Sequence, residues 1–222
     1  MNITKDSIDL NSCTQYRLYA TIRLRGDSMK AVNCLPDDYK EYYSVDLQSD
    51  KKMALIVNLI AILIAVVMVV PMCLIVPIST FWDVNNLGTE YNIRAISLLL
   101  LMILYLVLHE FVHGIAMKIC GTKKIKYGFT GMYAYAGSDD YYGKKAYIFI
   151  ALAPVVLWGI VIAIINCFVP LDWFWGIYFL QIFNISGAAG DFFVTIKFLR
   201  FPKDILVKDK GVSMTVYSKN EE

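Results

Sequence analysis

Residues 95–117 read AISLLLLMILYLVLHEFVHGIAM, and the fourteen residues that precede His109 in this stretch carry no charge. A helix needs about 20 mostly apolar residues to cross the hydrocarbon core of a bilayer, because each residue adds about 1.5 Å to its length. The stretch meets both conditions. It therefore predicts a transmembrane helix that carries two histidines and a glutamate near one end.

The composition of the whole chain agrees with a membrane protein. Of its 222 residues, 58% are hydrophobic and 18% are charged. A soluble domain is usually close to half apolar and a quarter charged, so this chain is too apolar for an ordinary water-facing fold, and it is not intrinsically disordered. The net charge of +2 offers no bulk positive charge for a nucleic acid, and we expect no nucleic-acid partner.

Three further stretches are long and apolar enough to cross a membrane: 53–77, 146–168 and 173–198. The last is the least uniform, since it contains Asn184, Ser186, Gly187, Gly190 and Asp191. We therefore predict an all-α polytopic membrane protein with about four transmembrane helices and small cytosolic β-like extensions. The predicted order is a cytosolic N-terminal segment (1–52), a transmembrane core (53–200) and a cytosolic tail (201–222).

The basic residues predict the orientation of these helices. Of the 21 lysines and arginines, 20 fall in the two terminal regions and the central loop, and Arg94 alone falls on the other side. Positively charged loops stay in the cytoplasm. We therefore expect a multi-pass protein of the cell membrane with both termini cytoplasmic, and lysines that contact phospholipid in the bilayer.

The polar parts of the chain carry strand patterns. Residues 16–25 alternate between apolar and polar side chains, and residues 205–217 are typical of a hairpin around Lys210-Gly211. Both lie on the predicted cytosolic side, where they could pair into one small sheet. Residues 123–137 predict short strands or a re-entrant loop, which would either offer an edge to an extended peptide or cap a site against lipid.

The five cysteines are scattered and form no Cys-x-x-Cys pair. This pattern predicts reduced thiols rather than a disulfide framework. Cys120 follows the histidine motif on nearly the same helix face, which leaves a regulatory thiol as an alternative. The simpler interpretation is a small apolar residue near a helix end.

The two histidines of the chain stand four residues apart, as His109-Glu110-Phe111-Val112-His113. On a helix they share one face and can bind one ion, while Glu110 lies about 100° away, beside the open position of the metal. In a soluble helix these residues could form an ordinary solvated face. At membrane depth three ionisable groups are costly unless they have a function, so the pattern predicts a zinc site.

A catalytic zinc normally has three protein ligands, and Asp191 is the one other acid inside the predicted helices. Along their helices His109 and Asp191 lie at depths of about 21 and 27 Å from the outer ends, so they can meet. Alternatively, Asp191 is an interfacial acid. Asn184 could orient a ligand or hold the substrate backbone. Asp139 and Asp140 form a solvated turn in the simplest interpretation, or supply the ligand instead.

The chain resembles membrane-embedded zincins of the site-2 protease type, and in particular the small bacterial membrane proteins of the putative zincin peptidase family. Besides the histidine motif, the residues that carry the resemblance are Gly121 with the strand-like 125–129, Ala153-Pro154 and 35–39. The resemblance runs over roughly residues 35–200. Asp191 stands between Gly190 and Phe192, whereas site-2 proteases have an Asn…Pro…Leu-Asp-Gly pattern there. The resemblance implies cleavage of peptides in or near the membrane.

Together these features predict a membrane-embedded zinc metalloprotease with one zinc per chain. His109, His113 and Asp191 would bind the ion, and Glu110 would act as general base and later as proton donor. The substrate would be a membrane-spanning or membrane-adjacent polypeptide, cut near the cytosolic face. The alternatives are a non-catalytic metal-binding scaffold, which the presence of Glu110 disfavours, and a small transporter component, which the lack of an internal repeat disfavours.

Overall fold

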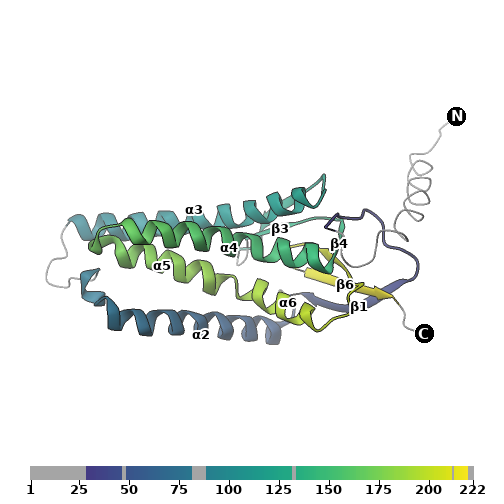
Figure 1. Cartoon of the computed structure of the whole chain (residues 1–222), viewed down its shortest axis with the longest axis horizontal. Coiled ribbons are helices and arrows are strands. Elements are labelled where there is room, and N and C mark those ends of the chain that lie inside the picture. The colour runs from purple at the N-terminus through teal and green to yellow at the C-terminus, as the bar shows by residue number, and fades with distance from the viewer. Residues whose placement is uncertain (1–28, 47–48, 82–88, 132–133, 212, 220–222) are drawn as a thin grey trace.

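The structure is a computed structural model, and it describes residues 29–46, 49–81, 89–131, 134–211 and 213–219. Long helices run side by side along its longest dimension, and the strands gather at one end (Figure 1). The helices are α2 (Lys51–Ile75), α3 (Thr89–Ile119), α4 (Lys144–Phe168), α5 (Leu171–Gly187) and α6 (Ala189–Leu199), with a 3-10 turn at Ile78–Thr80. Four helical stretches are long and apolar enough to cross a membrane, as the sequence predicts.

The predicted fourth helix is not continuous. The helix is interrupted at Ala188, where α5 ends and α6 begins. Glycine weakens a helix, and Gly187 and Gly190 stand on either side of the break, so this run is a natural place for it. Irregular backbone within a membrane-spanning stretch is tolerated where it lines a cavity, and Gly187, Ala189 and Gly190 line one.

One sheet closes the end of the helices. It is antiparallel and has the order β1 (Tyr39–Asp46), β6 (Ser213–Lys219), β5 (Leu206–Asp209) and β4 (Tyr141–Gly143). The predicted hairpin around Lys210-Gly211 is confirmed, and Gly211 has the positive φ of +98° that favours glycine in the turn. The hairpin strand β6 also pairs with β1, a strand that no alternation of apolar and polar residues predicts. Residues 16–25 lie outside the described residues.

A second, smaller sheet lies against α3. Its strands are β2 (Lys126–Phe129) and β3 (Ala134–Gly137), which confirms short strands within 123–137. Gly114 makes this contact possible, because a Cβ at that position would overlap the hydroxyl of Tyr127. The histidine-bearing turn of α3 therefore lies next to the small sheet.

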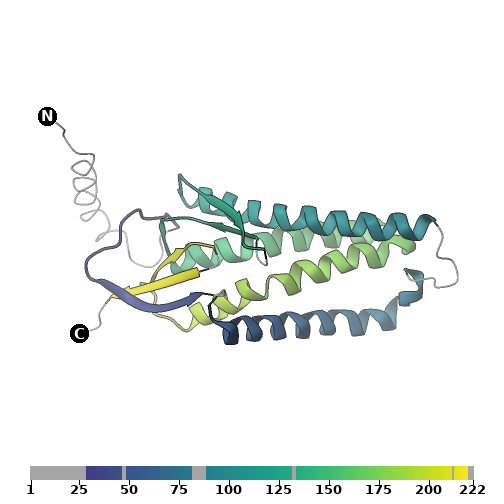
Figure 2. The same ribbon diagram turned by 180° about the vertical axis from the view of Figure 1, so that it is seen from behind.

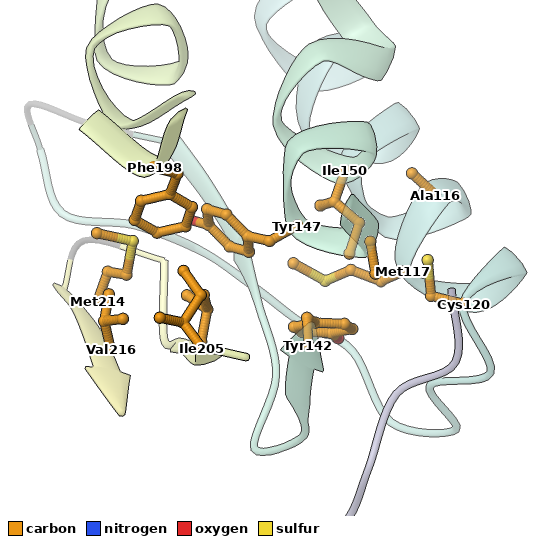
Figure 3. Packing of buried hydrophobic residues seen from close by; sticks show 12 residues of the cluster. Ala116, Met117, Cys120, Tyr142, Tyr147, Ile150, Phe198, Ile205, Met214 and Val216 are labelled. Atoms are coloured by element: carbon orange, nitrogen blue, oxygen red, sulfur yellow. The ribbon is translucent and has the colours of Figure 1, made fainter. Parts of the chain in front are cut away.

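The hydrophobic core joins the ends of the helices to the larger sheet (Figure 3). The rings of Tyr147 from α4 and Phe198 from α6 lie 5.2 Å apart at its centre. By contrast, α2 has no buried residue, and many leucines, isoleucines and valines of the other helices are exposed. An apolar surface of this extent is typical of helices that face lipid.

The cysteines follow the prediction in part. Cys120 is buried in the core cluster, which agrees with its interpretation as a small apolar residue, and Cys73, Cys120 and Cys167 are free. Cys34 is disulfide-bonded, so the prediction of uniformly reduced thiols is wrong at this position. Spacing along the sequence does not show which cysteines meet in space.

Candidate metal centre

The two histidines of α3 point to the same side of the helix. Their ring centroids lie 4.9 Å apart, and His109 is buried. Nitrogen atoms of His109 and His113 and a carboxylate oxygen of Glu110 all lie within 4.8 Å of one another. Three potential ligand groups thus gather within one turn of a helix, as expected for residues spaced i, i+1 and i+4.

Asp191 approaches both histidines from α6. One of its carboxylate oxygens lies 3.7 Å from Nε2 of His109, and the other lies 3.8 Å from Nε2 of His113. Two atoms bound to one tetrahedral zinc at about 2.1 Å lie roughly 3.4 Å apart, so the three groups need only a small adjustment to share an ion. Asp191 stands in the first turn of α6, and the break at Ala188 brings that turn to α3.

Each histidine also has a partner at its other ring nitrogen. Nδ1 of His113 lies 2.9 Å from the carbonyl oxygen of Ile150 in α4. A carbonyl can only accept, so Nδ1 carries the proton and donates it. The lone pair of the neutral ring then lies on Nε2, the atom that faces Asp191. This is the tautomer that a metal requires.

His109 is oriented by a chain of hydrogen bonds that crosses three helices. Its Nδ1 lies 2.7 Å from the hydroxyl of Tyr105, and that hydroxyl donates to Oδ1 of Asn184 at 2.7 Å. The Asn184 amide donates in turn to the carbonyl of Val155 at 3.2 Å. Because the Tyr105 proton is already used, the hydroxyl accepts from Nδ1 of His109. Nε2 of His109 is again left free to bind a metal.

Asn184 is fully buried and is not among the residues that line the cavity at the site. Of the two roles considered from the sequence, its position suits orienting a ligand and does not suit holding a substrate. Tyr105 is a residue that the sequence analysis missed. Its signal was available, since it stands one helical turn before His109.

Replacing Tyr105 with Phe should weaken zinc binding by about tenfold to a hundredfold, because the change removes the acceptor that orients His109. The measurement is the zinc dissociation constant of detergent-purified protein, determined by competition with a chelator. Tyr178→Phe is the matched control, since the Tyr178 hydroxyl likewise donates to a second helix, at the carbonyl of Met68, and Tyr178 does not line the cavity. Equal affinities in the two variants would contradict the orienting role of Tyr105.

A cavity of about 340 Å³ opens at the histidines. Its walls include His109, Glu110, His113 and Asp191, residues of β3, and the α2 residues Val57, Asn58 and Ala61. The Glu110 carboxylate accepts a hydrogen bond from the backbone amide of Ala136 in β3. Figure 2 shows α2 and α3 on either side of α5, with the small sheet beside α3.

A further carboxylate, Asp209 at the end of β5, lines the same cavity. It accepts hydrogen bonds from the Tyr147 hydroxyl at 2.6 Å and from the Gly211 amide at 2.7 Å. Burial raises the pKa of Asp209 to about 6, although these two donors act in the opposite direction. Asp209 cannot be recognised as a site residue from the sequence, because an aspartate before Lys-Gly is typical of an ordinary turn.

The structure does not bring Asp139 or Asp140 to the site, and neither lines the cavity. Asp139 is exposed and pairs with Lys126 at 2.6 Å. That pairing lowers the pKa of Asp139. These positions agree with the simpler interpretation of a solvated turn.

Comparison with known proteins agrees with a metal-binding role for the histidine motif. Residues 102–206 match a family described as putative zincin peptidase. The chain is also 32% identical over 122 residues to an uncharacterized 24.7 kDa protein in the gap 5′ region of Pyrococcus woesei. The alignment covers 53% of each protein, so the chain spans about half the length of the curated relative it matches. No solved structure matches.

Zincins are zinc-dependent, so the description of this family agrees with the His-Glu-x-x-His group on α3. The matched segment also contains Asp191 and the two hydrogen-bond partners, Ile150 and Tyr105, that orient the histidines. The part of the chain that carries the proposed metal ligands is therefore matched by the family of putative zincin peptidases, whereas Asp209 and the α2 wall of the cavity lie outside the match.

Proposed function

We propose that this protein is a membrane-embedded zinc metalloprotease that cuts membrane-spanning or membrane-adjacent polypeptides near the cytosolic face. The observation that carries the proposal is the convergence of two histidine Nε2 atoms and the Asp191 carboxylate, with Glu110 beside them. Two nitrogen donors and one carboxylate are a ligand set that catalytic zinc sites use. The described residues hold one cluster around these histidines, in which Glu110 is the nearest carboxylate, and we propose that it takes one zinc per chain.

In the proposed peptide hydrolysis, three residues would bind the zinc and one would transfer the proton. When bound, zinc would polarise the carbonyl of the scissile peptide and acidify a water molecule. His109, His113 and Asp191 would hold the ion. Glu110 would take the proton of the attacking water and deliver it to the nitrogen of the leaving amine, so that the peptide bond is broken and the proton is conserved.

The cavity suits a substrate in an extended conformation. Among the described strands, β3 pairs with β2 on one side, and residues 134–136 of β3 line the cavity. A peptide can bind along such a strand through backbone hydrogen bonds, whatever its sequence. A helical substrate would first have to unwind, because a peptide bond within a helix is screened by its own turns.

The surroundings of the site support a location in the membrane. Four helical stretches are long and apolar enough to span a bilayer, and the lysines and arginines favour cytoplasmic termini. The disulfide at Cys34 is the observation that opposes this orientation, since thiols in most cytosols are kept reduced. Labelling of Lys30 in sealed vesicles distinguishes the two orientations.

The proposal is tested with purified protein in vesicles together with a polypeptide reporter that spans the bilayer once. We expect one cut near the cytosolic end of the reporter, loss of cleavage after treatment with a zinc chelator, and recovery when zinc is added back. Bound zinc without any cleavage would favour a metal-binding scaffold. Zinc flux across the vesicles without cleavage would favour a transporter component.

A further inference from the structure

Pro154 lies inside α4 and is fully buried. In an α-helix, the carbonyl of each residue accepts a hydrogen bond from the amide four residues later. Proline has no amide hydrogen, and its ring displaces the carbonyl four residues before it. The carbonyl of Ile150 therefore has no partner of this kind within its own helix.

That same carbonyl accepts the hydrogen bond from Nδ1 of His113. We propose that Pro154 is a positioning residue, whose missing amide hydrogen leaves the Ile150 carbonyl free to orient His113 toward the metal. The inference rests on the proposed zinc site. A buried proline in α4 would thus help to orient a proposed metal ligand on α3.

A comparison within the chain separates this role from simple helix bending. Pro71 also lies inside a helix, α2, and leaves the carbonyl of Val67 without its usual partner. Val67 is exposed, and neither Pro71 nor Val67 lines the cavity. Of these two prolines within helices, only Pro154 frees a carbonyl that meets a proposed ligand.

The experiment restores the amide hydrogen at position 154. Pro154→Ala does so with a small side chain, and Pro154→Val does so with the same number of side-chain carbons as proline, in case the smaller side chain disturbs packing. Pro71→Ala is the matched control. For each detergent-purified protein, the zinc dissociation constant and the thermal midpoint of the metal-free form are measured.

We expect zinc to bind about tenfold to a hundredfold more weakly in both Pro154 variants, as for other losses of a hydrogen bond to a metal-bound histidine. The metal-free midpoint should stay equal or rise, because the variants repair the hydrogen-bond ladder of α4. Pro71→Ala should leave zinc affinity unchanged. A merely structural role of Pro154 would not produce weaker zinc binding together with a midpoint that holds or rises.

Two results would overturn the inference alone. One is wild-type zinc affinity in both Pro154 variants, and the other is a parallel loss of affinity and metal-free stability in both, which would show a packing role. If the wild-type protein itself binds no zinc, the proposed function fails, and this inference fails with it. The wild-type measurement thus distinguishes the two failures.

Discussion

Replacing Asp191 with Ala should weaken zinc binding by at least about a hundredfold. Loss of a residue that only hydrogen-bonds to a metal ligand costs up to about that much, and Asp191 is a proposed ligand itself. The carboxylate spans both histidines, with one oxygen 3.7 Å from His109 and the other 3.8 Å from His113. Its removal would leave the ion to the two histidines, with the Glu110 carboxylate beside them. The measurements are zinc per chain by elemental analysis and the zinc dissociation constant by competition with a chelator, made side by side with the wild-type protein.

Asp139→Ala is the control for this experiment, because Asp139 is the acid that the sequence offers as an alternative ligand. Its carboxylate is exposed and paired with Lys126, so zinc content should not change. If Asp191→Ala retains zinc at the wild-type affinity, the third ligand lies elsewhere. Glu110, whose carboxylate lies near both histidines, would then be the next group to test.

The sequence predicts the helices well because their signal is local. Length and hydropathy suffice to locate 53–77, 95–117 and 146–168. The observed helices begin two to six residues earlier than predicted, and α2 ends at Ile75, two residues before the predicted end. The spacing of His109 and His113 predicts a shared helix face for the same reason. Asp191 could be found as well, since an acid within an apolar stretch stands out whatever its partner is.

What the sequence could not predict depends on contacts between distant segments. The glycines around Ala188 mark a weak point of the helix, but the cavity that they line is not visible in the chain alone. Asp209 reaches the site because the hairpin packs against α4, and nothing in its neighbours along the chain indicates this contact. Likewise β1 pairs with β6 across more than 160 residues, a register set by the larger sheet.

Helix α4 links the two histidines, although it carries none of the proposed ligands. Its Ile150 carbonyl orients His113 directly, and its Val155 carbonyl orients His109 through Asn184 and Tyr105. The two carbonyls lie on either side of Pro154 in the same helix. A shift of α4 against α3 would therefore disturb both ligands together, so the packing of these helices and the geometry of the metal site are coupled.

Replacing Glu110 with Gln should leave zinc bound and reduce peptide hydrolysis by about a hundredfold to ten-thousandfold, the usual contribution of a general base. Glutamine has nearly the same shape as glutamate and keeps an oxygen that can accept from the Ala136 amide. It cannot take a proton from water. The measurements are zinc content and the rate of reporter cleavage in vesicles, made on the same preparation.

Asp209→Asn is the comparison that makes this test specific, because Asp209 is a second carboxylate in the cavity and burial raises its pKa to about 6. Asparagine can still accept from one of its two donors, Tyr147 or Gly211. We expect this variant to retain most of the cleavage rate. The opposite pattern, with cleavage lost in Asp209→Asn and kept in Glu110→Gln, would transfer the role of the base to Asp209. Undiminished cleavage in both variants would remove Glu110 and Asp209 as the base, because each would then be dispensable.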